Sequence, residues 1–115
     1  MLVEKLRYTI WAADADRATA FYTTVFGAQV VRQNAAIIEL EVAGGLIAIH
    51  GGDEGAPTWT GLTFQVADVV AGAAEVIAAG GQCAREPQPE DGEPPHIAMC
   101  EDTDGNQFML SRARH

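Results

Sequence analysis

The chain has 115 residues, of which 48% are hydrophobic and 20% are charged, so it fits one compact domain or two small modules and not a disordered polypeptide. Sixteen acidic and seven basic residues give a formal net charge of −9. Because nucleic acids and anionic membranes attract Lys and Arg, this balance argues against both as partners.

The first half of the chain predicts a strand, a helix and three further strands. Residues 6–12 alternate apolar and polar side chains, which is typical of a half-buried strand. Asp14 is expected to cap a helix, and Gly27 is expected to end it in a left-handed conformation. The apolar stripe of this helix consists of Ala18, Phe21, Tyr22 and Val25. Strands are predicted at 29–32, 36–42 and 46–50, with Gly44-Gly45 as a two-residue hairpin turn.

The second half repeats this pattern. Asp68 and Gly81 each lie 54 positions after their counterparts Asp14 and Gly27. A strand is predicted at 62–66, followed by a helix that Asp68 caps and Gly80-Gly81 ends. The stripe of this helix consists of Val69, Ala73, Val76 and Ile77. Further strands are predicted at 82–86, 96–100 and 107–111, with a surface loop at 87–95 and a turn at 103–106.

The two halves therefore predict an α+β fold of two βαβββ modules in tandem. The first module covers residues 1–52, residues 53–59 form a linker, and the second module covers residues 60–115.

The chain has no features of a membrane or secreted protein. No apolar run reaches the roughly 18 residues of a membrane span, and the N-terminus lacks a basic region followed by an apolar core. Cys83 and Cys100 are the only cysteines and form no CxxC motif. We therefore expect a cytoplasmic protein with reduced thiols.

Three segments of the chain resemble the vicinal oxygen chelate superfamily, which includes glyoxalase I, bleomycin-resistance proteins and extradiol dioxygenases. They are Asp14–Tyr22 with Val25–Gly27, Phe64–Val69 with Ala79–Gly81, and Glu101–Asn106, which is close to the family's DPDGN turn. The resemblance implies that each module forms a half-barrel sheet and that two modules complete a ligand cleft. It also implies a homodimer, because members this short often pair.

Metal-dependent members of this superfamily place ligands on the first and last strands of each module. The first-strand ligand lies seven residues before the capping Asp, which gives Arg7 and Gly61 in this sequence. The last-strand positions fall at Ala48 and Met109. None of these is a usual ligand of a divalent metal, because arginine stays cationic and Ala and Gly have no donor. We therefore expect no metal and no other cofactor.

A displaced metal site is the alternative. His50 lies two residues beyond Ala48 and thus on the same strand face, and Glu39 or His96 could join it across strands. His96 and Cys100 would lie about 13 Å apart on an extended strand, too far to chelate one ion together. For each histidine, a hydrogen-bonded or cavity-lining role is favoured over metal ligation. Cys100 is not expected to be a nucleophile, because no His is placed as its base.

Arg7, Thr9 and Trp11 share the strand face that carries the ligand position in the family. Either Arg7 binds a carboxylate or phosphate while Trp11 stacks on a flat ring, or Arg7 pairs with a carboxylate such as Glu39 and Trp11 only packs. Glu39 and Glu41 alternate with apolar residues. They either face the cleft and favour a cationic ligand or form a solvated face, and the second interpretation is favoured.

The sequence thus predicts a metal-independent small-molecule-binding protein of the glyoxalase/bleomycin-resistance type that sequesters an aromatic or antibiotic-like ligand. The predicted ligand-binding residues are Arg7, Trp11, Glu39, His50, Trp59 and Met109. The alternative is a lyase, isomerase or dioxygenase of the same superfamily, with a displaced metal or with His50 as the catalytic acid–base group. A third possibility is a purely structural dimeric module.

Overall fold

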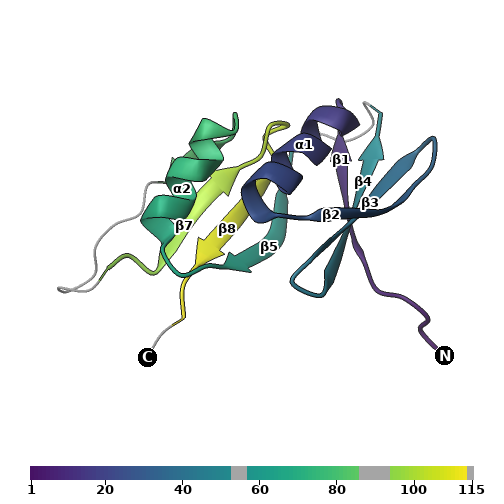
Figure 1. The fold of residues 1–115 in the computed structure, drawn as a ribbon, viewed down its shortest axis with the longest axis horizontal. Helices are drawn as coiled ribbons and strands as arrows, with labels where there is room; N and C mark the ends of the chain where they lie inside the picture. The colour runs from purple at the N-terminus through teal and green to yellow at the C-terminus, as the bar shows by residue number, and fades with distance from the viewer. Residues whose placement is uncertain (53–56, 86–93, 114–115) are drawn as a thin grey trace. The chain divides into compact units, whose positions relative to one another are not determined.

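A computed structural model describes residues 1–52, 57–85 and 94–113, without the side chains of residues 84 and 85. Its internal contacts divide the chain into two compact units, Met1–Ala56 (unit 1) and Pro57–His115 (unit 2). In the described residues, each unit contains one helix and one four-stranded sheet in the order βαβββ (Figure 1). The predicted α+β fold of two βαβββ modules is therefore confirmed. Residues 53–56 of the predicted linker and most of the predicted loop at 87–95 lie outside the described residues.

Unit 1 contains a mixed sheet with the strand order β1-β4-β3-β2. Its strands are β1 (Tyr8–Ala12), β2 (Gln29–Gln33), β3 (Ile37–Val42) and β4 (Gly45–Gly51). β1 runs parallel to β4, while β3 runs antiparallel to both β4 and β2. β1 begins two residues later than predicted, and the other three strands agree with their predicted ranges to within one residue.

Helix α1 (Ala15–Phe26) begins and ends where the sequence predicts. The Asp14 carboxylate accepts a hydrogen bond from the Arg17 backbone N–H at 3.0 Å, which satisfies one of the free donors of the first turn. Gly27 ends the helix with φ of 66°, and its N–H donates to the Thr23 carbonyl. Three residues of the predicted stripe, Ala18, Phe21 and Tyr22, are buried, and α1 contacts β1, β3 and β4.

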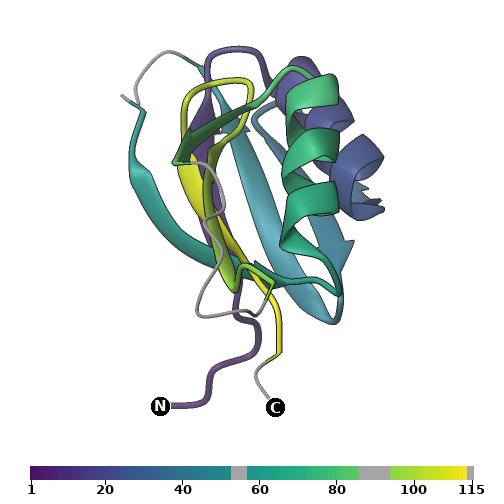
Figure 2. The ribbon, with the colours of Figure 1, turned by 90° about the vertical axis from the view of Figure 1, so that its left-hand side faces the viewer.

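Unit 2 repeats the arrangement with the strand order β5-β8-β7-β6. Its strands are β5 (Trp59–Gln65), β6 (Gln82–Arg85), β7 (Ile97–Glu101) and β8 (Gln107–Ser111). The Asp68 carboxylate caps helix α2 (Val69–Ala78) by accepting from two backbone N–H groups. Figure 2 shows α2 along one face of its sheet, in agreement with its contacts to β6, β7 and β8.

The buried face of α2 differs from the prediction at one position. Ile77 is 56% exposed and does not belong to the core, whereas Val69, Gly72, Ala73 and Val76 are buried. A Cβ atom at Gly72 would lie 3.1 Å from the Leu110 Cδ1 atom. Because Gly72 has no side chain, α2 can approach β8 closely. The spacing of apolar residues does not predict that a glycine belongs to the buried face.

The hairpin turn between β3 and β4 also differs from the prediction. Val42 pairs with Gly45, so the turn residues are Ala43 and Gly44 and not Gly44 and Gly45. Both have positive φ, 51° at Ala43 and 80° at Gly44, as a type I′ turn requires.

The corresponding turn of unit 2 is organised by the buried Asp102 side chain. Its Oδ1 accepts from the backbone N–H groups of Asp104 and Asn106, and its Oδ2 accepts from the Asn106 side-chain amide. Gly105 has φ of 81° in the predicted turn, a conformation that glycine adopts without steric cost. The segment that resembles the family's DPDGN turn thus connects β7 and β8 and is held by hydrogen bonds among its own residues.

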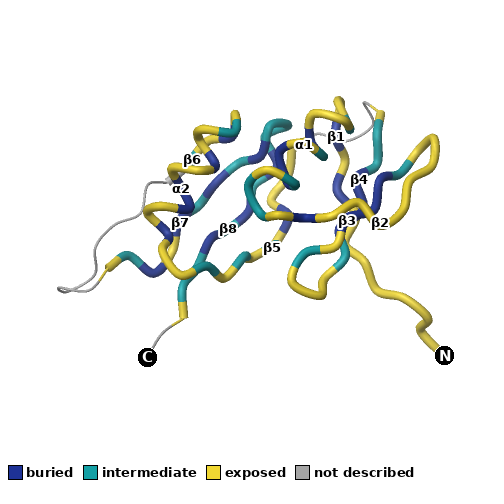
Figure 3. The backbone as a smooth tube through the Cα atoms, in the orientation of Figure 1, coloured by how far each residue is buried: buried dark blue, intermediate teal, exposed yellow. Residues whose placement is uncertain are grey.

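Burial alternates along β1, β7 and β8, whereas β3 and β4 each have three consecutive buried residues in the middle of the strand (Figure 3). Within the described segments, no helix is both long and apolar enough to cross a membrane.

Candidate functional site

The candidate site lies on the outer face of unit 1, defined here as the side of its sheet turned away from α1. The buried residues Ile10, Leu40 and Ile49 occupy the α1 side, so their strand neighbours point to the outer face. Two rows of register partners cross this face, one from Thr9 through Ala48 and Glu39 to Arg32, and one from Trp11 through His50 to Ile37.

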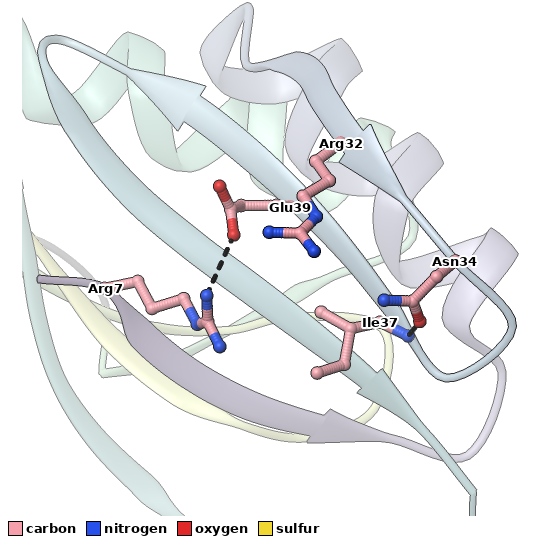
Figure 4. A pocket seen from close by; sticks show the side chains of 5 residues that line it. All are labelled: Arg7, Arg32, Asn34, Ile37 and Glu39. Carbon is pink, nitrogen blue, oxygen red and sulfur yellow. Dashed lines mark hydrogen bonds and ion pairs between the residues drawn. The ribbon is translucent and has the colours of Figure 1, made fainter. Parts of the chain in front are cut away.

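Glu39 is the charged centre of this face. It is only 3% exposed, and its carboxylate forms ion pairs with Lys5 and with the Arg7 Nη1 atom, the latter at 3.3 Å (Figure 4). The predicted alternative in which Arg7 pairs with Glu39 is therefore confirmed. Glu39 does not form a solvated face, whereas Glu41 on the same strand is exposed. Because two cations already balance Glu39, it is not an unpaired carboxylate that would favour a cationic ligand.

The charges around Glu39 set its protonation state. The hydrogen bond from Lys5 and the positive charges of Lys5, Arg7 and Arg32 lower the pKa of the Glu39 carboxyl, and they outweigh burial, which acts in the opposite direction. Glu39 is therefore ionised at neutral pH.

Arg32 reaches this face because of an irregularity in β2. Val30 pairs with Leu40, but Arg32 pairs with Glu39, so Val31 forms a bulge between them. In a regular strand, Arg32 would point to the same side as Val30. The extra residue turns the Arg32 side chain to the outer face instead, which is a known effect of β-bulges.

Trp11 and His50 form an aromatic pair one row further along β1 and β4. Their ring centroids lie 4.1 Å apart with an interplanar angle of 40°. Trp11 is 38% exposed, so part of the indole is open to solvent. The His50 Nδ1 atom lies 2.8 Å from the Gly51 carbonyl oxygen and must be the donor there, which leaves Nε2 as the acceptor in the neutral ring.

The family's metal-ligand positions do not provide a donor set for a divalent metal in either unit. In unit 1, Ala48 is fully buried and Arg7 is held by Glu39. In unit 2, Gly61 has no side chain, and Met109 offers only a thioether, a soft and weak donor. Among the described residues, no group of three His, Cys, Asp or Glu side chains is placed to hold a metal ion.

Gly61 also lies in a distorted part of β5. Trp59 pairs with Gln107 and Thr63 pairs with Met109, so two extra residues bulge out of β5 between these pairs. The Thr60 hydroxyl donates to the Gln107 carbonyl at 2.8 Å and accepts from the Leu62 N–H at 3.0 Å, replacing lost ladder bonds. Gly61 has φ of 78° there. Trp59, a predicted ligand-binding residue, is 45% exposed.

The remaining predicted candidates lie in unit 2. His96 is buried and precedes β7, so the strand starts one residue later than predicted. Cys100 is buried opposite Cys83 on β6, with 3.5 Å between their Sγ atoms. Burial and the contact with Cys83 raise the pKa of the Cys100 thiol to about 12, which agrees with the expectation that it is not a nucleophile.

Sequence reasoning missed three residues of the outer face, namely Lys5, Arg32 and Asn34. Lys5 precedes the first strand, and Arg32 reaches Glu39 only because of the bulge. Arg7 precedes β1, two strands from Glu39 on β3, and Arg32 lies on β2, the neighbouring strand on the other side. Only the strand order β1-β4-β3-β2 places these charges together.

Comparison with known proteins identifies the class. Residues 6–110 match the model of the Glyoxalase/Bleomycin resistance protein/Dioxygenase superfamily, so the chain belongs to this superfamily. The resemblance to the vicinal oxygen chelate fold is thereby confirmed.

Three individual proteins are similar to this chain in sequence or in structure. A probable lactoylglutathione lyase of Vibrio cholerae is 30% identical, over 84% of this chain and 81% of its own length. The crystal structure of the genomically encoded fosfomycin resistance protein FosX of Listeria monocytogenes has a TM-score of 0.80 at 21% identity, covering 99% of this chain and 96% of FosX. A superfamily enzyme of Burkholderia phytofirmans has a TM-score of 0.71 at 20% identity, covering 92% and 95% of the two chains.

Proposed function

We propose that this protein binds a small molecule that contains a flat ring and does so without a divalent metal at the family's ligand positions. The observation that carries the proposal is the chemistry of those positions. Arg7, Ala48 and Gly61 have no donor for a metal, and Met109 has only a weak one. An intact family scaffold without these donors favours ligand binding over metal-assisted chemistry.

On the outer face of unit 1, the proposed contacts are Arg7, Trp11 and His50. The exposed part of Trp11 and its neighbour His50 offer a surface on which a ring stacks. For Trp59 and Met109 in unit 2, a ligand-binding role stays a prediction from the family resemblance.

Two measurements test this proposal. Elemental analysis of protein purified without chelator is expected to find no stoichiometric metal. Titration of Trp11→Leu with a panel of aromatic compounds should give much weaker binding than titration of wild type. Trp59→Leu, which removes a similarly exposed indole, is the matched variant for unit 2. Stoichiometric, tightly held Ni, Zn, Fe or Mn contradicts metal independence.

A second candidate function is an enzyme of the lyase, isomerase or dioxygenase type. It is favoured by the His50 geometry, because the bond to Gly51 fixes Nδ1 as donor and leaves Nε2 to accept a proton. The Vibrio cholerae relative, named a probable lactoylglutathione lyase, is consistent with it. Turnover of a hemithioacetal or a catechol that disappears in His50→Ala supports this candidate. A displaced metal would be detected by the elemental analysis.

A further inference from the structure

The outer face of unit 1 contains a small pocket beside Glu39, lined by Arg7, Arg32, Asn34, Ile37 and Glu39 (Figure 4). Its volume of about 50 Å³ is well below the roughly 300–1,000 Å³ of pockets that enclose a whole drug-sized ligand. The pocket therefore fits one functional group of a ligand and not the entire molecule.

Apart from the Glu39 carboxylate, the polar groups of this pocket are hydrogen-bond donors with spare capacity. The Arg32 side chain makes no hydrogen bond or ion pair within the described residues, although its charge acts on Glu39. Arg7 donates one N–H to Glu39, and a guanidinium has five. Figure 4 shows both guanidinium groups directed toward the same space.

Asn34 adds a third donor whose orientation is fixed. Its Oδ1 accepts from the backbone N–H groups of Ala36 and Ile37 at 2.9 and 3.0 Å. The side-chain amide nitrogen is therefore on the opposite side, and Figure 4 shows it directed toward Arg32. The amide cannot be reversed without losing both backbone bonds.

The local charge is opposite to that of the whole chain. Lys5, Arg7 and Arg32 provide three positive charges, and Glu39 provides one negative charge. Two positive charges remain in a protein whose formal net charge is −9. Glu41, the next carboxylate on β3, is exposed and pairs across the strands with Gln29 and Leu46.

We propose that this pocket is an oxyanion site, in which Arg7, Arg32 and the Asn34 amide bind a carboxylate, phosphate or phosphonate group of a small-molecule ligand. Guanidinium groups bind such planar or tetrahedral oxyanions with charge-assisted hydrogen bonds. The buried Glu39 positions Arg7, and the β2 bulge positions Arg32. Ile37 links the site to the Trp11–His50 row, so an attached ring lies beside the aromatic pair. This inference rests on the proposed function and specifies in addition that the ligand carries a negatively charged group.

The test uses three probes in NMR titrations of the full chain: inorganic phosphate, phenylphosphonate and benzyl alcohol. Wild type is expected to bind both anions, and Arg32→Met should weaken both by about tenfold, the usual effect of losing a hydrogen bond to a charged group. Arg32→Lys should recover part of the loss, because it restores the charge but not the planar fork. Arg17→Met on α1 removes the same charge elsewhere and should change affinity less than about twofold.

The outcomes separate this inference from the proposed function. Anion binding that Arg32→Met leaves unchanged overturns the oxyanion site, as does the failure of wild type to bind either anion at about 10 mM. Benzyl alcohol binding without anion binding supports the proposed function and overturns this inference. Phosphate binding that depends on Arg32, without benzyl alcohol binding, supports the oxyanion site and contradicts the aromatic ligand. Equal melting temperatures of wild type and Arg32→Met establish that the fold is intact.

Discussion

Glu39 is a buried carboxylate that is stabilised by the cations around it. A buried charge of this kind costs free energy unless it is paired, and here Lys5 and Arg7 provide the pairs. Removing the carboxylate would leave two neighbouring cations without their counter-charge. In the proposed oxyanion site, Glu39 therefore acts as a positioning residue for Arg7.

We predict that Glu39→Gln lowers the melting temperature at pH 7 and reduces the pH dependence of stability in acid. The pKa of Glu39 is lowered from its ordinary value of 4.5, so the carboxylate contributes stability above pH 4.5 and loses that contribution as the pH falls through the lowered pKa. Thermal melts of both proteins from pH 7 to pH 3 should therefore converge. Glu41→Gln, an exposed change on the same strand face, is the control, and equal melting temperatures of the two variants at pH 7 would contradict the prediction.

We predict that Cys100 resists alkylation in the folded protein at pH 8. With a pKa of about 12, only about one thiol in ten thousand is ionised at that pH, and the thiolate is the reactive species. The measurement is peptide mass spectrometry of wild type treated with iodoacetamide, with and without denaturant. Because the pKa is raised from 9.0, the thiol's contribution to stability is full below pH 9 and is lost as the pH rises toward 12. Rapid alkylation of Cys100 in the native protein contradicts this description of the site.

The sequence predicts the position of Arg7 in the candidate site but not that of Arg32. Alternation along the first strand places Arg7, Thr9 and Trp11 on one face, and the pairing of Arg7 with Glu39 follows as one of two interpretations. Arg32 could not be placed, because regular alternation turns it to the side of Val30 and only the bulge reverses it. A bulge depends on the fit of both strands, which a single strand pattern does not contain.

At the scale of elements, the hairpin between β3 and β4 shows local strain. Ala43 has φ of 51°, a left-handed conformation that costs a residue with a Cβ about 1 kcal/mol or more. The sequence Gly44-Gly45 suggested a turn of two glycines, but the pairing of Val42 with Gly45 moved the turn back by one residue. Register, which the apolar pattern of β3 and β4 determines, prevailed over the local preference of glycine.

We predict that Ala43→Asn stabilises the protein by about 0.5–1 kcal/mol. Asn tolerates the left-handed conformation, and Asn-Gly is a favoured pair in type I′ turns. Urea denaturation of both proteins should give a higher midpoint with an unchanged slope. Gly44→Ala is the opposite change and should destabilise, because φ of 80° strains any side chain there. A lower midpoint for Ala43→Asn would show that the turn is not type I′ in solution.

The helices were predictable because residues with a specific backbone role bound them. Asp14, Gly27 and Asp68 act as the sequence predicted, and the offset between the halves places the second helix. The start of β5 was missed by three residues. Its pairing with β8 is interrupted at Gly61, and Thr60 supplies side-chain bonds in place of the ladder. Apolar alternation predicts only the regular part of such a strand.

At the scale of the whole molecule, the two units carry one architecture with different chemistry. The row from Thr9 through Ala48 to Glu39 in unit 1 corresponds to the row from Thr63 through Met109 to Met99 in unit 2. Both rows continue to an arginine, Arg32 in unit 1 and Arg85 in unit 2, but Met99 occupies in unit 2 the position that the paired Glu39 carboxylate has in unit 1. The internal repeat predicts the shared fold, but it does not predict which copy carries the carboxylate.

We predict that the protein is a homodimer whose stability increases with salt. Short members of this superfamily often pair, and this chain exposes large apolar residues, among them Leu2, Leu6, Val30 and Val31, whose burial would favour association. Each chain carries a formal net charge of −9, so two chains repel each other. Raising the ionic strength from about 0.01 M to 0.1 M shortens the Debye length from roughly 30 Å to 10 Å and weakens this repulsion.

Light scattering coupled to gel filtration should give twice the chain mass of 12.2 kDa. When salt is present, dissociation on dilution should occur at a lower protein concentration. A mass of one chain at every concentration and salt level contradicts the dimer, and a dimer that salt dissociates would point instead to an interface held by charge pairs.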